Sequence, residues 1–178
     1  MKHHLYDSDI DETLRTINNI TMYATSLAVE EDTTKQRVKR FSVNLFGSAV
    51  SRGTTTSLNS LIDKKTPAGT DEYAIGSHHA LDPFAKSALT RKNVKDMSAP
   101  TWVKYSINSL SYLSATGSAF SRVQDGGHSF ADQLVSVSIG NFIGLFFYEL
   151  LLNDTNNLQS VQTSFHDKNI ILTTTWSF

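Results

Sequence analysis

The residues best suited to chemistry stand together in segment 121–132. An arginine at position 122 precedes a glycine turn, and a histidine at position 128 follows it. If a helix begins after Gly127, His128 and Asp132 lie four residues apart on one face of it. The carboxylate would then hold one imidazole nitrogen, fix the tautomer and leave the other nitrogen free to act. Arg122 offers a planar fork of donors that suits a phosphate group. The segment therefore predicts a phosphate-handling site built around a histidine.

A second pair of histidines supplies what such a site needs. Phosphoryl transfer through His128 requires a proton donor for the leaving group. His78 and His79 stand about fifty residues upstream, where the apolar spacing predicts the start of a helix. Ser77 adds a hydroxyl, and the backbone N–H groups at a helix N-terminus bind anions. We expect these residues to form the other half of the site.

Composition limits the class of protein. With 178 residues, of which 39% are hydrophobic and 19% charged, the chain is expected to form one globular domain spanning 1–178. Sixteen basic and seventeen acidic residues nearly cancel, so nucleic acid is not expected as a partner. Without cysteine the chain cannot form disulfides or thiolate metal sites.

Hydrophobic periodicity predicts an all-α fold, a helical bundle of about six helices with a small C-terminal β-hairpin. We expect the core of the bundle at 35–152 and the hairpin at about 158–178. The expected helical segments are 9–29, a second beginning near 35, a short one within 51–62, 80–89, 101–123 and 130–152. Residues 64–73 are predicted to form a loop and 91–96 a charged connector.

The segment Phe130–Leu152 is the most apolar in the chain, and two roles fit it. Its length can span a bilayer, which takes about 20 residues. Gln133, Asn141 and Glu149 interrupt it, which favours a buried central helix of the bundle. The basic residues at 35, 37, 39 and 40 either touch an anionic membrane surface or form a solvated helix face.

The spacing of these residues resembles a known family. Ser121-Arg122, followed by His128 and Asp132, is similar to the third motif of the type-2 phosphatidic acid phosphatase and vanadium haloperoxidase superfamily, Ser-Arg-x5-His-x3-Asp. The segment 76–79, Gly-Ser-His-His, stands where that family has Pro-Ser-Gly-His. The resemblance covers roughly residues 52–152.

The first family motif, Lys-x6-Arg-Pro, is only partly present. Pro67 agrees with it, but Asn59 stands at the lysine position and Thr66 at the arginine position. Both positive charges of that motif are therefore missing. Lys64, Lys65 or Arg52 could substitute for them, although none has the family spacing.

The resemblance implies an all-α fold and a role for each matching residue. His128 would be the nucleophile that takes the phosphoryl group, Asp132 would orient it, and His79 would be the general acid. The phosphate oxygens would be held by Arg122, Ser77 and the backbone N–H of His78. Family members hydrolyse lipid phosphates or small phosphate esters without a metal or other cofactor. The resemblance also implies a bacterial envelope or periplasmic location, with possible association with a membrane surface.

Two alternatives to a working phosphatase stay open. Because an electrostatic group in such a site is worth ~3–4 kcal/mol, a chain without the two charges could instead bind an anion or a partner, or serve structurally. His78, if protonated, would replace part of the charge. The third hypothesis is a divalent-metal hydrolase, since imidazole and carboxylate ligands suit zinc or manganese. Its ligands would be His78, His79, Asp82, His128 and Asp132.

Overall fold

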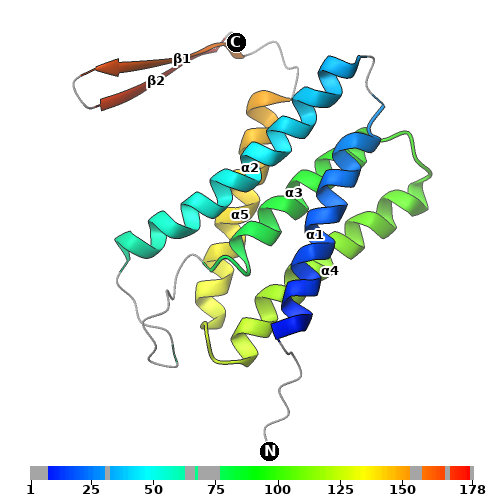
Figure 1. The fold of residues 1–178 in the computed structure, drawn as a ribbon, viewed down its shortest axis with the longest axis vertical. Helices are drawn as coiled ribbons and strands as arrows, with labels where there is room; N and C mark the ends of the chain where they lie inside the picture. The colour runs from blue at the N-terminus through cyan, green and yellow to red at the C-terminus, as the bar shows by residue number, and fades with distance from the viewer. Residues whose placement is uncertain are drawn as a thin grey trace, which may run out of the picture.

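Five helices make up the bundle in the part of the chain that the structure describes (Figure 1). This computed structural model describes residues 8–30, 33–62, 67, 77–152, 158–166 and 169–176, with the side chains of residues 8, 9 and 59 and of 158–176 left outside the description. The helices are α1 (Ser8–Ala28), α2 (Thr34–Leu61), α3 (Leu81–Asp96), α4 (Thr101–Gln124) and α5 (Phe130–Leu151). The backbone of β1 (Leu158–His166) pairs antiparallel with that of β2 (Asn169–Trp176). The predicted all-α class is confirmed.

Helix α2 joins two segments that the sequence separates, and this accounts for five helices where about six are predicted. Its start is fixed by a capping box, in which the Thr33 hydroxyl accepts from the Gln36 N–H and the Gln36 side chain accepts from the Thr33 N–H. Gly53 costs a helix about 1 kcal/mol relative to alanine, which the surrounding helix tolerates. Serine and threonine hydroxyls near it bond back to carbonyls of the preceding turn, as Thr55 does to Ser51.

Helix α3 is the centre of the bundle and contacts all four other helices, which surround it in the order α1, α2, α5, α4. Residues 81–90 are all buried. The prediction of a charged connector at 91–96 is wrong, because α3 continues through these residues. Its polar groups there lie on two faces: Arg91 and Lys95 are exposed, whereas Asn93 is fully buried and donates to Asn44 at 3.0 Å.

Helix α5 packs against α3 through glycine. A Cβ added at Gly140 would collide with the carbonyl oxygen of Leu81, and one at Gly144 with that of Ala85. The two backbones therefore approach too closely for any side chain at these positions. The larger apolar side chains of α5, Leu134, Phe142 and Phe146 among others, remain exposed.

The prediction that segment 130–152 is the buried central helix is therefore wrong. Only 28% of the most apolar stretch of α5 is buried, and α3 occupies the centre instead. Among the described helices, α5 alone is long and apolar enough to cross a membrane by length and composition.

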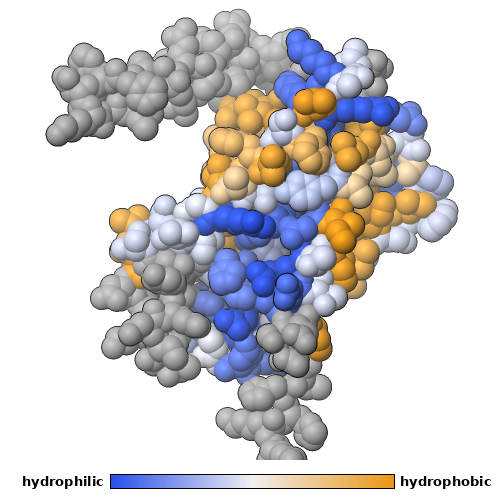
Figure 2. Space-filling view, in the orientation of Figure 1, coloured by the Kyte–Doolittle hydropathy of each residue, from blue (hydrophilic) through white to orange (hydrophobic). Residues whose placement is uncertain are grey.

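The interior of the bundle is unusually polar. Helix α4 presents four buried serines at helical spacing, Ser111, Ser114, Ser118 and Ser121. Asn18 of α1 donates to the Ser111 carbonyl and to the Ser114 hydroxyl, both at 3.0 Å. Figure 2 shows a hydrophilic area on one face, between the lower halves of α1 and α2, with hydrophobic residues above and beside it. Small polar residues thus join the helices, while many large apolar side chains face outward.

Candidate functional site

The turn between α4 and α5 places His128 over the last turn of α4. Gly126 has a φ of 75°, a left-handed conformation that favours glycine. The N–H of His128 then donates to the Arg122 carbonyl at 3.0 Å. The Arg122 side chain lies beside this turn and donates through Nη1 to Asp125 Oδ2 at 3.0 Å. His128 itself is buried.

Helix α5 begins at Phe130, so His128 precedes it, and the condition under which His128 and Asp132 would share one helical face is not met. Ser129 is the N-cap: its hydroxyl accepts from the Asp132 N–H at 3.2 Å and donates to Asp132 Oδ2 at 2.6 Å. Asp132 is 3% exposed and lies in the first turn of α5, where the helix dipole stabilises a carboxylate. The helix begins at Phe130, where the predicted segment 130–152 also begins, because Ser129 is a better N-cap than Gly127.

Ser77 connects the start of α3 to the start of α5. Its N–H donates to the Ser136 hydroxyl at 3.1 Å, and that hydroxyl donates to the Asp132 carbonyl at 2.9 Å. The Ser77 hydroxyl accepts from the His79 N–H at 3.3 Å, and the Ser77 carbonyl accepts from the Leu81 N–H at 2.8 Å. Two predicted motifs that are far apart in the sequence are thereby joined by buried hydrogen bonds.

His79 is held by a residue that the sequence did not single out. Its Nδ1 lies 2.6 Å from Asp11 Oδ2 on α1, and both side chains are more than nine-tenths buried. Ser118 of α4 donates to Asp11 Oδ1 at 2.5 Å and is also within 2.9 Å of the His79 carbonyl oxygen. Within the described residues Nε2 of His79 makes no hydrogen bond. The arrangement fixes the ring and leaves one nitrogen available for proton transfer.

Asp11 is a carboxylate stabilised inside the protein. Burial by itself would raise its pKa. Hydrogen bonds from His79 and Ser118, together with the positive charges of His79 and Arg15, outweigh this effect. The pKa of Asp11 is therefore lowered. Arg15 Nε lies 3.3 Å from Asp11 Oδ2, one helical turn along α1.

His78 lies at the surface and packs against His79, with ring centroids 3.8 Å apart and ring planes tilted by 40°. Although the residue as a whole is exposed, loss of water around its ring lowers its pKa to about 4, helped by the positive charges of His79, Arg15 and Arg122. His78 is therefore neutral at physiological pH. This opposes the hypothesis that a protonated His78 replaces a missing positive charge.

An apolar groove of about 230 Å³ lies between α4 and α5, beside the turn that carries His128. Phe120 and Phe130 line it from the two helices, and Phe84 of α3 is part of its lining. Gln133, which directly follows Asp132, also lines the groove, and its buried amide has no hydrogen-bond partner among the described residues. The groove can therefore accept an apolar group that also forms a hydrogen bond with the Gln133 amide.

The residues required for the metal alternative do not come together. Asp82 belongs to a different cluster, where its carboxylate binds Lys86 at 2.5 Å and Ser51 at 2.9 Å. Arg52, a suggested substitute for the missing charge, is also engaged there, with Nε 3.4 Å from Asp82. In the described part of the chain no three histidine, aspartate or glutamate residues could hold a metal ion.

Part of the first motif falls outside the described residues. Thr66, Lys64 and Lys65 lie there, as does Gly76 of the second motif. Asn59 is in the last turn of α2. The structure also places Arg15 near the histidines. Sequence reasoning missed this residue, because it stands about sixty residues before His78 and belongs to no motif.

Comparison of the chain with protein-family models, with curated proteins and with solved structures gave no match. A function for the chain can therefore be proposed only from the geometry of the site.

Proposed function

We propose that this protein is phosphatase-like and hydrolyses a phosphomonoester through a phosphohistidine at His128, without a metal. The observation that supports the proposal is the buried triad of Asp11, His79 and Ser118, which leaves Nε2 of His79 available. A histidine whose ring is oriented by a carboxylate through one nitrogen can act as a general acid through the other. The buried hydrogen bonds through Ser77 and Ser136 link this triad to the start of α5, next to His128.

The proposed reaction has two steps. A ring nitrogen of His128 attacks phosphorus, and the phosphorus–oxygen bond to the alcohol breaks as His79 gives that oxygen a proton. Water then attacks the phosphohistidine, His79 takes a proton from it, and inorganic phosphate leaves. Asp132 would orient His128, while Ser77, the His78 N–H and Arg122 would hold phosphate oxygens.

Arg15 offers positive charge that Asn59 and Thr66 lack. It lies beside Asp11 and contributes, with Arg122, to the lowered pKa of His78. One or both arginines would stabilise the charge on the transferring phosphoryl group. The apolar groove between α4 and α5 favours a substrate with an apolar portion, such as a lipid phosphate, over a small polar ester. We also propose that the C-terminal segment forms the predicted β-hairpin. The proposed location of the protein is the bacterial envelope.

The test is hydrolysis of p-nitrophenyl phosphate by the purified chain in the presence of a strong chelator. We expect turnover that vanadate inhibits and that His128→Ala abolishes, with the helical circular dichroism of the variant unchanged. A folded protein that hydrolyses no phosphomonoester, lipid ones included, contradicts the proposal. Activity that the chelator removes would favour the metal hydrolase instead.

One observation favours a second candidate, a catalytically impaired protein that binds an anion. Arg122 donates to Asp125, so part of its guanidinium fork is engaged with a carboxylate instead of facing a ligand. For this candidate, vanadate or phosphate would raise the melting temperature without any turnover.

A further inference from the structure

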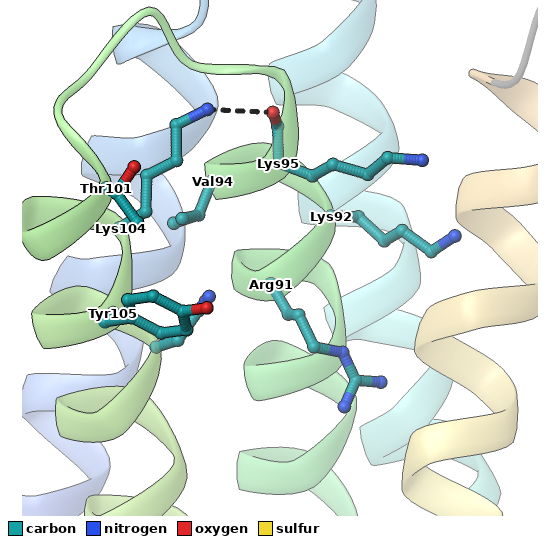
Figure 3. A pocket seen from close by; sticks show the side chains of 8 residues that line it. Arg91, Lys92, Val94, Lys95, Thr101, Lys104 and Tyr105 are labelled. Carbon is teal, nitrogen blue, oxygen red and sulfur yellow. Dashed lines mark hydrogen bonds between the residues drawn. The ribbon is translucent and has the colours of Figure 1, made fainter.

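A second pocket lies at the opposite end of α3 from the histidines. It has a volume of about 420 Å³ and is formed where α3 ends and α4 begins (Figure 3). Helix α3 contributes Arg91, Lys92 and Lys95, and helix α4 contributes Lys104, Tyr105 and Asn108. At a helical rise of about 1.5 Å per residue, the pocket is roughly 20 Å from His79 along α3. It is therefore separate from the proposed phosphatase site.

The pocket lining is strongly basic. Four of its eight residues are lysine or arginine, and none is acidic. Lys92 pairs with Glu149, and Lys104 donates to the Lys95 carbonyl at 3.2 Å, the bond drawn in Figure 3. Arg91 and Lys95 are exposed, and no ion pair engages either of them in the described part of the chain. These two flexible side chains can turn toward an anion in the pocket.

Two acidic residues next to the pocket lining, Asp96 after Lys95 and Glu149 beside Lys92, are already paired with other groups. Asp96 pairs with Arg40 at 3.1 Å and accepts a hydrogen bond from the Tyr148 hydroxyl. Glu149 pairs with Lys92. An anion entering the pocket therefore meets net positive charge, and repulsion from these carboxylates is weakened.

Helix α4 adds two features that fit a phosphate ester. It begins at the pocket, where Pro100 is the N-cap and supplies no capping side chain, so the positive end of the helix dipole faces this region. Farther along α4, Asn108 Oδ1 is buried and has no hydrogen-bond partner among the described residues. An acceptor in that state fits a ligand with a hydroxyl group next to its phosphate.

We propose that this pocket binds a phosphate group carried by a hydroxyl-bearing molecule, with Arg91, Lys95 and Lys104 holding the phosphate. A glycerol phosphate has this chemistry, either as a free ester or as the headgroup of an anionic lipid. Two exposed aromatic side chains adjoin the site: Trp102 is 72% and Tyr105 is 69% exposed. Aromatic and basic residues in this combination suit a membrane–water interface, so the lipid source needs its own arm in the test.

The experiment uses the His128→Ala protein, which prevents turnover, and measures binding of glycerol 3-phosphate by titration calorimetry. A double substitution, Arg91→Gln with Lys104→Gln, removes two pocket charges. Its matched control, Lys35→Gln with Lys39→Gln, removes the same charge from exposed positions on α2. A parallel arm measures cosedimentation of the pocket variant with phosphatidylcholine vesicles, with and without phosphatidylglycerol. The control in this arm is the His128→Ala parent, because Lys35 and Lys39 are themselves candidate contacts to an anionic membrane surface.

We expect the pocket variant to bind about tenfold more weakly than the control, the loss that follows from removing charge-assisted hydrogen bonds. If the loss appears with glycerol 3-phosphate, the ligand is a free ester. If it appears only with vesicles that contain phosphatidylglycerol, the ligand is a lipid headgroup. Binding that is equal in the pocket variant and its control, or absent with every probe, overturns the proposal. Because phosphatase activity is not measured, the result is independent of the proposed function.

Discussion

Two buried ionic clusters lie about one helical turn apart at the start of α3. They differ in whether the basic residue keeps a nitrogen atom that can still react. In the first, Asp11 holds Nδ1 of His79. In the second, Asp82 holds the amino group of Lys86. All four residues are more than nine-tenths buried. Burial and charge are therefore similar in both.

The difference lies in the chemistry of the base. Lys86 has one nitrogen, and its carboxylate partner is further occupied by Ser51 and Arg52. Burial lowers the pKa of Lys86, while the charge of Asp82 and their hydrogen bond act to raise it. His79 has a second nitrogen beyond the one that Asp11 holds. A buried charge pair thus becomes a candidate site only where one partner keeps an atom that can still react.

The largest expected effect comes from breaking the second cluster. Lys86→Met should destabilise the fold by about 3 kcal/mol, because Asp82 remains buried without its main counter-charge. This value is at the lower end of the usual range, since Ser51 and Arg52 still contact the carboxylate. The free energy of unfolding in urea measures it.

Lys92→Met is the matched control on the same helix. Lys92 also pairs with a carboxylate, Glu149, but both side chains are partly exposed, at 25% and 41%. A pair of this kind contributes about 0–1 kcal/mol. Equal losses for the two methionine variants would show that burial does not set the strength of the Asp82–Lys86 pair.

The central position of α3 could not be predicted from hydropathy. The most apolar segment, 130–152, is the natural choice for the centre of a bundle, whereas α3 contains Asp82, Lys86 and Asn93. These polar residues are buried because each finds a partner on another helix or along α3, as Asn93 does in Asn44. Pairing between distant residues leaves no trace in the periodicity of one segment.

Only part of the candidate site could be predicted, because local motifs are visible in the sequence whereas pairing between distant residues is not. Ser77, His79 and Asp132 stand in local motifs. The structure links Ser77 to Asp132 through the Ser136 hydroxyl, and His79 to Ser77 through the Ser77 hydroxyl. Asp11 is nearly seventy residues before His79 and looks in the sequence like an ordinary residue of a first helical turn. Only the packing of α1 against α3 brings it to the imidazole.

A smaller effect is expected from the first cluster. Because the pKa of Asp11 is lowered in the folded state, its contribution to stability is complete above the ordinary carboxyl pKa and is lost as the pH falls. Asp11→Asn should therefore be less stable at neutral pH by about 1.5–3 kcal/mol, the value of hydrogen bonds to a charged group. It should also lose less stability on acidification than the parent chain.

Urea unfolding at neutral and acidic pH measures both quantities. Glu12→Gln is the control, since Glu12 is the next residue of α1 and is exposed. Such a surface change is expected to alter stability by about 0.5 kcal/mol or less. If Asp11→Asn follows the pH dependence of the parent chain, the proposed role of Asp11 as a buried anion beside His79 is wrong.

The smallest effect concerns His78. Its protonation state determines whether the positive charge beside His79 comes from His78 or from Arg15 and Arg122. Its pKa of about 4 in the folded state lies below the ordinary value of 6.5, so between these values the unfolded chain binds more protons. The His78 contribution to stability is therefore lost as the pH falls from about 6.5 to about 4, and it changes little below that window. His78→Gln should reduce that loss, and only slightly, because solvent screens an exposed residue. An NMR titration of the His78 ring tests the cause directly. Titration near pH 4 would leave Arg15 and Arg122 as the cations beside His78 and His79 at neutral pH, whereas titration near the ordinary histidine value would return His78 to the candidate phosphate site as a charged group.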